Sequence, residues 1–169
     1  MLAPSVAPFV GAFLFEIFML IFPKMREPDD FGAGYFGAPR GSGTHNGVDF
    51  TAEAGSACYS VTEGVVTKFG YPYADDLSYR YVEVTHDEVT RFRYFYVEPF
   101  EDLQIGDKVF EGLYLGAVQD VAGRYETDDK KMNNHIHFEV IEKGKYVDPV
   151  DALNWAGGPN LYALGLVPA

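Results

Sequence analysis

The chain has 169 residues and a formal net charge of −12, which suit one acidic domain with a hydrophobic core. Such a chain, without a basic run, repels polyanions, so nucleic acid and an anionic membrane surface are excluded as its main partners. The single cysteine, Cys58, excludes an intrachain disulfide framework, and its apolar surroundings are those of a small buried residue.

Residues 1–23 form an almost wholly apolar segment that is interrupted by prolines. Its longest proline-free stretch, residues 9–22, has about 14 residues, whereas a helix needs roughly 20 to span a bilayer. No basic residue precedes this stretch, and Lys24 and Arg26 follow it, which is the reverse of a cleaved export signal. We expect an apolar helix that docks against a protein partner. The alternatives are an uncleaved membrane anchor and a helix that folds back on its own domain.

A polar break at residues 27–30 divides the chain into three predicted parts. Residues 1–30 are the apolar segment and its linker, residues 31–153 are one domain, and residues 154–169 are a C-terminal tail. The domain begins with a glycine-rich loop, residues 31–43. No Gly-Lys-Ser/Thr sequence follows this loop, so the pattern does not support a phosphate site.

Short strands separated by turn clusters fill the chain from residue 48 onward. Strands are predicted at residues 48–51, 58–61, 64–69, 79–84, 90–97, 103–109 and 111–118. Because no helical period intervenes, the pattern predicts an all-β fold, an antiparallel sandwich or barrel. The polar loop of residues 119–134 leads into one more strand and either walls a site or is a solvated insertion. Residues 146–153 are expected to form a closing turn and a short helix.

Four residues in two distant stretches are candidates for a metal site. His135 and His137 are two positions apart in a predicted strand, so their side chains project from the same face. His45 and Asp49, which flank Gly47, can present an imidazole and a carboxylate together. A catalytic zinc site uses three such ligands and keeps a fourth position for water. Four candidates for three positions therefore leave one histidine free for proton transfer. The fourth histidine of the chain, His86, lies in a turn and is expected on the surface.

The motifs around these residues resemble those of the lysostaphin-type (LytM-type) zinc endopeptidases, which cut peptide cross-links in bacterial peptidoglycan. The similarity extends from about residue 31 to residue 153. It rests on Phe36-Gly37, on His-x-Gly-x-Asp-Phe at residues 45–50, on Gly-Asp-x-Val at residues 106–109, on His-x-His-Phe-Glu-Val at residues 135–140 and on Val-Asp-Pro at residues 147–149. The two histidine motifs are specific in combination, although each alone is weak. The resemblance implies an antiparallel β fold with a groove across one face and the metal in its floor.

Position by position, the resemblance implies that His45, Asp49 and His137 bind one zinc ion and that His135 is a catalytic histidine. The family usually has one more histidine in a Tyr-x-His-Leu pattern, and this chain has Tyr96 at that position. A phenol can still donate a hydrogen bond to a developing oxyanion, so Tyr96 is a candidate catalytic residue. The alternative is an ordinary strand residue and an enzyme with reduced or lost activity.

Two further positions near the histidine pair are informative. Asn133-Asn134 stand where the family commonly has Gly-Pro, and we expect this difference to alter the wall of the groove more than the metal site. Glu139 shares a face with the two histidines by alternation, so it is either a partner of an imidazole or a carboxylate on the rim. The rim position is the preferred interpretation.

The resemblance predicts a zinc-dependent endopeptidase that hydrolyses peptidoglycan peptides. The alternative is a non-catalytic or weakly active LytM-type component that binds or supports a virion or envelope assembly. The retained apolar segment, together with the resemblance, favours a bacteriophage tail-associated wall hydrolase. Such a protein would be located in the virion and, on entry, in the host periplasm and cell wall. The alternative location is an anchor in a bacterial envelope membrane.

Overall fold

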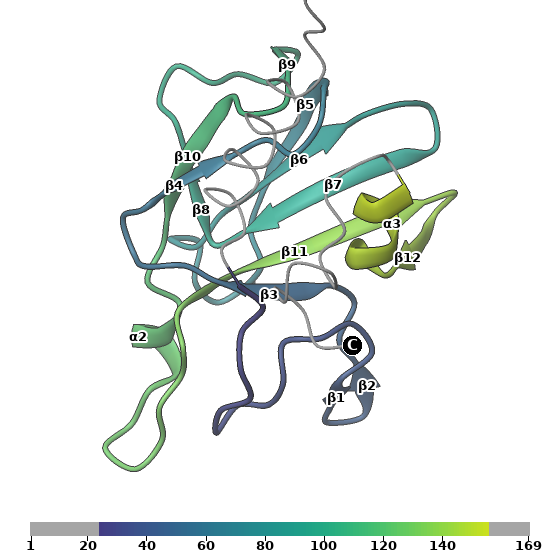
Figure 1. Cartoon of the computed structure of the whole chain (residues 1–169). Helices are drawn as coiled ribbons and strands as arrows, with labels where there is room; N and C mark the ends of the chain where they lie inside the picture. The colour runs from purple at the N-terminus through teal and green to yellow at the C-terminus, as the bar shows by residue number, and fades with distance from the viewer. Residues whose placement is uncertain (1–23, 156–169) are drawn as a thin grey trace, which may run out of the picture.

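The computed structural model describes residues 24–155, in which antiparallel β-sheets dominate and two short helices are present (Figure 1). The elements are β1 (Pro39–Arg40), β2 (Gly43–Thr44), β3 (Val48–Thr51), β4 (Ala57–Tyr59), β5 (Gly64–Gly70), β6 (Tyr81–Thr85), β7 (Thr90–Phe95), β8 (Val97–Pro99), β9 (Lys108–Val109), β10 (Tyr114–Val118), α2 (Ala122–Tyr125), β11 (His135–Glu142), β12 (Lys145–Val147) and α3 (Pro149–Trp155). The predicted all-β antiparallel fold is therefore confirmed.

Two parts of the sequence-based prediction fall outside the described residues: the apolar helix within residues 1–23, and residues 156–169 of the tail. Within residues 24–155 no helix is long and apolar enough to cross a membrane. The predicted closing turn near residue 146 is a strand, β12, which pairs with β11 before α3 begins.

The larger sheet has seven strands in the order β12-β11-β7-β6-β5-β9, and β3 pairs with β11 beside this path. β11 is the strand on which the others converge: it pairs with β7 on one side and with β3 and β12 on the other. In Figure 1 it runs as the light green arrow between β3 and β7. A second sheet, in the order β4-β10-β8, contributes Cys58, Val97 and Leu115 to the core.

Alternation along β11 separates the core from the opposite face of the sheet. Ile136, Phe138 and Val140 are each at most 1% exposed and belong to the hydrophobic core. The Phe138 ring lies 5.0 Å from the Tyr94 ring and 6.0 Å from the Phe92 ring, measured between centroids. Since successive strand residues point to opposite faces, His135, His137 and Glu139 share the other face, as the sequence predicted for the histidine pair.

The strand predicted at residues 90–97 is interrupted at Tyr96, where the chain passes from β7 in the larger sheet to β8 in the smaller one. Tyr96 adopts a left-handed backbone conformation with φ of 62°. Its N–H and that of Val97 both donate to the Arg80 carbonyl, at 2.9 and 3.2 Å. A left-handed conformation costs a non-glycine residue on the order of 1–3 kcal/mol, so the surrounding hydrogen bonds must hold it in place.

The packing of Phe138 predicts a large loss of stability on truncation. Phe138→Ala should lower the free energy of unfolding by about 3–5 kcal/mol, because it leaves a cavity among packed aromatic rings. Ile105→Ala is the control, since Ile105 is 63% exposed and its truncation should change stability by less than about 0.5 kcal/mol. Urea unfolding in the presence of a chelator separates this effect from metal binding. Equal losses in the two variants would contradict the assigned core.

Candidate metal centre

Three side chains from two paired strands and the turn before them converge at one point. Asp49 on β3 lies opposite His137 on β11 in the antiparallel register, and His45 precedes β3. The His45 Nε2 and Asp49 Oδ1 atoms are 3.0 Å apart. His137 Nδ1 lies 2.9 Å from each of them. The structure therefore brings together the three residues that the sequence assigned as metal ligands.

The triangle of donor atoms fits a zinc ion. Zinc bound at about 2.0–2.1 Å in tetrahedral geometry sets its donors roughly 3.3 Å apart, close to the observed spacing. Two ring nitrogens and a carboxylate oxygen at this spacing direct three lone-pair sites at one point, which a cation stabilises. Three protein ligands also leave a fourth coordination position, as in catalytic zinc sites.

Hydrogen bonds on the far side of each ring fix which nitrogen faces the centre. His45 Nδ1 donates to the Tyr35 carbonyl at 2.9 Å, which leaves Nε2 with a free lone pair. His137 Nε2 lies 3.3 Å from Glu139 Oε1, which leaves Nδ1 for the metal. Glu139 is 6% exposed, so the structure supports its role as an imidazole partner and not the preferred rim position.

The second oxygen of Asp49 is held by arginines. Asp49 Oδ2 accepts hydrogen bonds from Arg26 Nε at 3.2 Å and Nη2 at 3.0 Å, and from Arg40 Nη2 at 3.4 Å. Burial opposes the charged carboxylate, but the hydrogen bond with His137 and the charge of that imidazole hold the pKa of Asp49 well below its usual value. The sequence analysis missed Arg26, which it placed in the linker. The residue lies 23 positions from its partner, and no motif connects them.

A row of charged side chains extends from Glu139 across the sheet. Glu139 Oε2 accepts from Arg93 Nη1 on β7 at 3.5 Å, and Arg93 Nε donates to Glu83 on β6 at 2.7 Å. Glu83 in turn accepts from Thr67 on β5 at 3.0 Å. Because each carboxylate is paired, the row fixes the position of the Glu139 side chain beside His137.

His135 lies beside the three ligands but outside their triangle. Its Nδ1 donates to the Asn133 carbonyl at 2.8 Å, and its Nε2 is 3.8 Å from Asp49 Oδ1. Burial lowers the pKa of His135, although the negative charge of Asp49 acts against this. A neutral imidazole with an unprotonated Nε2 directed toward the centre is suited to accept a proton.

Tyr96 packs against the ring of His135. The two rings meet edge to face with centroids 5.5 Å apart, and the Tyr96 hydroxyl accepts a hydrogen bond from the Tyr73 hydroxyl at 3.1 Å. Burial raises the pKa of Tyr96 to about 12, so the phenol keeps its proton at neutral pH. Tyr96 can therefore act as a hydrogen-bond donor but not as a base at neutral pH.

The loop of residues 119–134 leads into β11, and hydrogen bonds of the Asn134 side chain hold the end of this loop in place. The Asn134 amide donates to the Ala52 carbonyl at 2.9 Å and to the Gln119 carbonyl at 3.1 Å, and its oxygen accepts from the Ala122 N–H at 3.0 Å. The loop is also tied to the chain before the domain, because the Asn133 N–H donates to Asp29. The loop is thus tied down at both asparagines, and the expected effect of Asn133-Asn134 on the wall of a groove stays a prediction.

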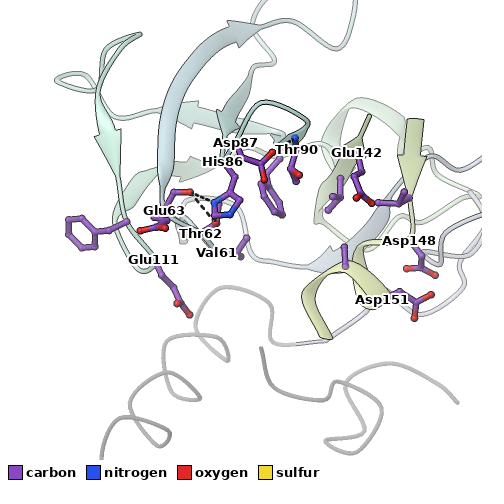
Figure 2. A pocket seen from close by; sticks show the side chains of 15 residues that line it. Val61, Thr62, Glu63, His86, Asp87, Thr90, Glu111, Glu142, Asp148 and Asp151 are labelled. Carbon is purple, nitrogen blue, oxygen red and sulfur yellow. Dashed lines mark hydrogen bonds between the residues drawn. The ribbon is translucent and has the colours of Figure 1, made fainter. Parts of the chain in front are cut away.

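A cavity of about 1040 Å³ lies on the opposite face of the larger sheet (Figure 2). It is lined by Phe92 and Val140, which alternate with Arg93 and Glu139 of the metal face. His86 borders this cavity, where its Nδ1 contacts the Thr62 hydroxyl at 3.0 Å and the Glu63 carbonyl at 2.9 Å. The exposed position predicted for His86 is confirmed, and this histidine borders the cavity and is not among the residues of the metal centre.

The contact between Glu139 and His137 predicts weaker metal binding when the carboxylate is neutralised. Glu139→Gln should lower the affinity for Zn²⁺ about 10–100-fold, because His137 loses a charged acceptor that orients its ring. Glu142→Gln on the same strand is the matched control, since Glu142 borders the cavity on the opposite face. Competition with a chromogenic chelator measures both affinities. Unchanged affinity in Glu139→Gln would show that the contact does not support the ligand.

Comparisons with known proteins agree with this geometry. The sequence model of Peptidase family M23 matches residues 43–149, a range that contains every candidate site residue. Two uncharacterized proteins, one from Mycobacterium bovis and one from Mycobacterium tuberculosis, are each 30% identical over 131 residues. The aligned region covers 76% of this chain and 28% of each relative, so the chain spans less than a third of their length.

Solved structures show the same fold. Lysostaphin from Staphylococcus simulans superposes with a TM-score of 0.58 at 22% identity, over 79% of this chain and 55% of that one. A zinc-containing peptidase from Vibrio cholerae gives a TM-score of 0.53 at 20% identity, over 75% of this chain and 38% of that one. By the extent of the family match, the chain belongs to Peptidase family M23, the lysostaphin-type peptidases.

Proposed function

We propose that the protein is a zinc-dependent endopeptidase that hydrolyses peptide cross-links of bacterial peptidoglycan. His45, Asp49 and His137 are the metal ligands, and His135 and Tyr96 are the catalytic residues. The observation that carries the proposal is the triangle of three donor atoms 2.9–3.0 Å apart, with a separate imidazole 3.8 Å from the shared carboxylate oxygen. Membership of a peptidase family and the likeness to lysostaphin support the substrate class.

The residues around the triangle divide the steps of hydrolysis between them. Zinc bound at such a site lowers the pKa of a water molecule toward neutrality and polarises the scissile carbonyl. His135 Nε2 accepts a proton from the attacking water and later returns it to the departing amine.

Tyr96 supplies the remaining function at the position where the family usually has a histidine. Its hydroxyl donates a hydrogen bond to the oxygen that becomes negatively charged in the transition state. Because its pKa is raised, the phenol stays protonated while the oxyanion forms. His135 is then the base of the reaction, and Tyr96 acts as a donor.

The proposals for partners and location depend on the apolar segment, residues 1–23, which lies outside the described residues. Docking against a protein partner, contact with a membrane, and a place in a phage tail or in a bacterial envelope therefore stay predictions. Peptidoglycan peptides are the proposed substrate partner.

Ligand and base variants should separate metal binding from turnover. His45→Ala, Asp49→Ala and His137→Ala should each lose bound zinc, because two protein ligands cannot hold it tightly. His135→Ala should keep most of the zinc and lower turnover about 10²–10⁴-fold, because it removes only the proton acceptor. Metal analysis after dialysis and the release of amines from purified peptidoglycan measure the two properties. If His135→Ala loses zinc as completely as His137→Ala, the assignments of ligand and base are reversed.

Replacing Tyr96 should test the donor directly. Tyr96→Phe should lower kcat about 10²-fold with little change in KM and in zinc content, because the lost hydrogen bond forms only in the transition state. Tyr96→His, which restores the family's imidazole, should remain active. If the zinc-loaded protein and Tyr96→His both fail to release amines, the alternative of a binding component that does not cut peptidoglycan is supported.

A further inference from the structure

Three tyrosine hydroxyls form a line that ends at Tyr96, whose ring packs edge to face against His135. The Tyr125 hydroxyl donates to the Tyr73 hydroxyl at 3.0 Å, and the Tyr73 hydroxyl donates to the Tyr96 hydroxyl at 3.1 Å. The Tyr73 and Tyr96 rings are stacked, with an interplanar angle of 19°. The three residues come from the loop before β6, from α2 and from the break between β7 and β8. The line therefore exists only in the folded chain.

A cation packed on the middle ring of the line favours one direction for its protons. The Arg124 guanidinium lies 4.0 Å from the Tyr73 ring centroid and 5.8 Å from the Tyr125 ring centroid. Asp75 and Asp76 hold it there through ion pairs of 3.0 and 2.9 Å. A guanidinium only donates hydrogen bonds, so nearby hydroxyl oxygens turn their lone pairs toward it and their protons away. The protons are thereby directed toward Tyr96.

The direction matters because a phenol has only one proton. When Tyr73 donates to Tyr96, the Tyr96 oxygen is an acceptor and its own proton stays available to the metal centre. In the opposite direction, Tyr96 would donate its proton to Tyr73 and would have none for a substrate. Burial raises the pKa of Tyr96 and so keeps this proton on the phenol at neutral pH.

Hydrogen bonds hold the backbone of Tyr96 as well as its hydroxyl. Its N–H donates to the Arg80 carbonyl at 2.9 Å, and its carbonyl accepts from the Gln119 N–H at 2.8 Å. These bonds hold the left-handed conformation in which the ring leaves β7 and stacks on Tyr73. Because the Tyr96 backbone is held by these bonds, the hydrogen bond with Tyr73 fixes the position of the Tyr96 hydroxyl oxygen.

We propose that Tyr73 is a positioning residue for peptide hydrolysis: it holds the Tyr96 hydroxyl and donates to it, so that Tyr96 presents its own proton to the developing oxyanion. The inference rests on the proposed endopeptidase function and adds a residue to its machinery. Tyr73 acts through Tyr96 and does not touch the substrate itself.

Tyr79 provides a matched control in the same aromatic cluster. Its ring packs edge-on against Tyr73 and Tyr96, at centroid distances of 5.5 and 6.4 Å. Its hydroxyl, however, donates to the Asp120 carbonyl at 2.9 Å and is not part of the line. Tyr73→Phe and Tyr79→Phe therefore remove the same group from neighbouring rings, and each keeps its ring packing.

Kinetics of the zinc-loaded full chain on a cross-link peptide give the first test. Tyr73→Phe should lower kcat about 10-fold with KM and zinc content nearly unchanged, and Tyr79→Phe should stay within about twofold. In a Tyr96→Phe background, Tyr73→Phe should cause no further loss, because its effect passes through the missing hydroxyl. Losses that multiply in the double variant, or equal losses in Tyr73→Phe and Tyr79→Phe, would overturn the proposal.

A spectroscopic test keeps the inference separate from the proposed function. In protein labelled with ¹³Cζ-tyrosine, the Tyr96 resonance, assigned through Tyr96→Phe, should shift in Tyr73→Phe and stay in place in Tyr79→Phe. The phenyl ring in Tyr73→Phe keeps its stacking, so the shift reports the lost hydrogen bond. An unchanged Tyr96 resonance overturns the positioning role. Absence of turnover in the zinc-loaded parent overturns the endopeptidase function instead, whatever the resonance shows.

Discussion

The site depends on one buried carboxylate, Asp49, which is 2% exposed. An unpaired charge at such a position would be destabilising by several kcal/mol, so both of its oxygens need partners. Oδ2 receives them from Arg26 and Arg40, while Oδ1 faces the two ligand histidines. The arginines thus satisfy one side of the carboxylate and leave the other side free for a cation. This division suits Asp49 both to a structural ion pair and to the proposed metal site.

The strands around Asp49 make this arrangement possible because they keep the hydrophobic core on one face and the metal site on the other. On β11 the core residue Phe138 directly follows His137, the proposed ligand. The packing of Phe138 in the core therefore fixes the position of the His137 backbone on the other face. Gly47 shows how tight the fit is: a Cβ there would overlap the Phe138 carbonyl oxygen and would lie 2.8 Å from His137 Cε1. The glycine between His45 and Asp49 is therefore needed for the first ligand pair to approach β11.

The sequence was sufficient for those parts of the site that follow from local geometry. Because side chains along a strand alternate between its two faces, the sequence placed His135 and His137 on one face. The short strands separated by turn residues predicted the antiparallel fold. Arg26 could not be predicted, because its contact with Asp49 joins a stretch predicted as a linker to a strand 23 residues away. The left-handed turn at Tyr96 was also missed. The pattern of residues 90–97 favours an unbroken strand, and only the change from one sheet to the other breaks it.

The tyrosine at position 96 changes how the donor of the site must be controlled. An imidazole has two nitrogens and can exchange between tautomers, so its partner must select which one carries the proton. A phenol with its pKa raised to about 12 always carries one proton, and only the direction of that proton has to be selected. A second hydroxyl held on the same oxygen, as Tyr73 is, can make that selection, with the Arg124 guanidinium packed on the Tyr73 ring. With tyrosine at position 96, control of the proposed donor therefore lies with the loop that carries Tyr73.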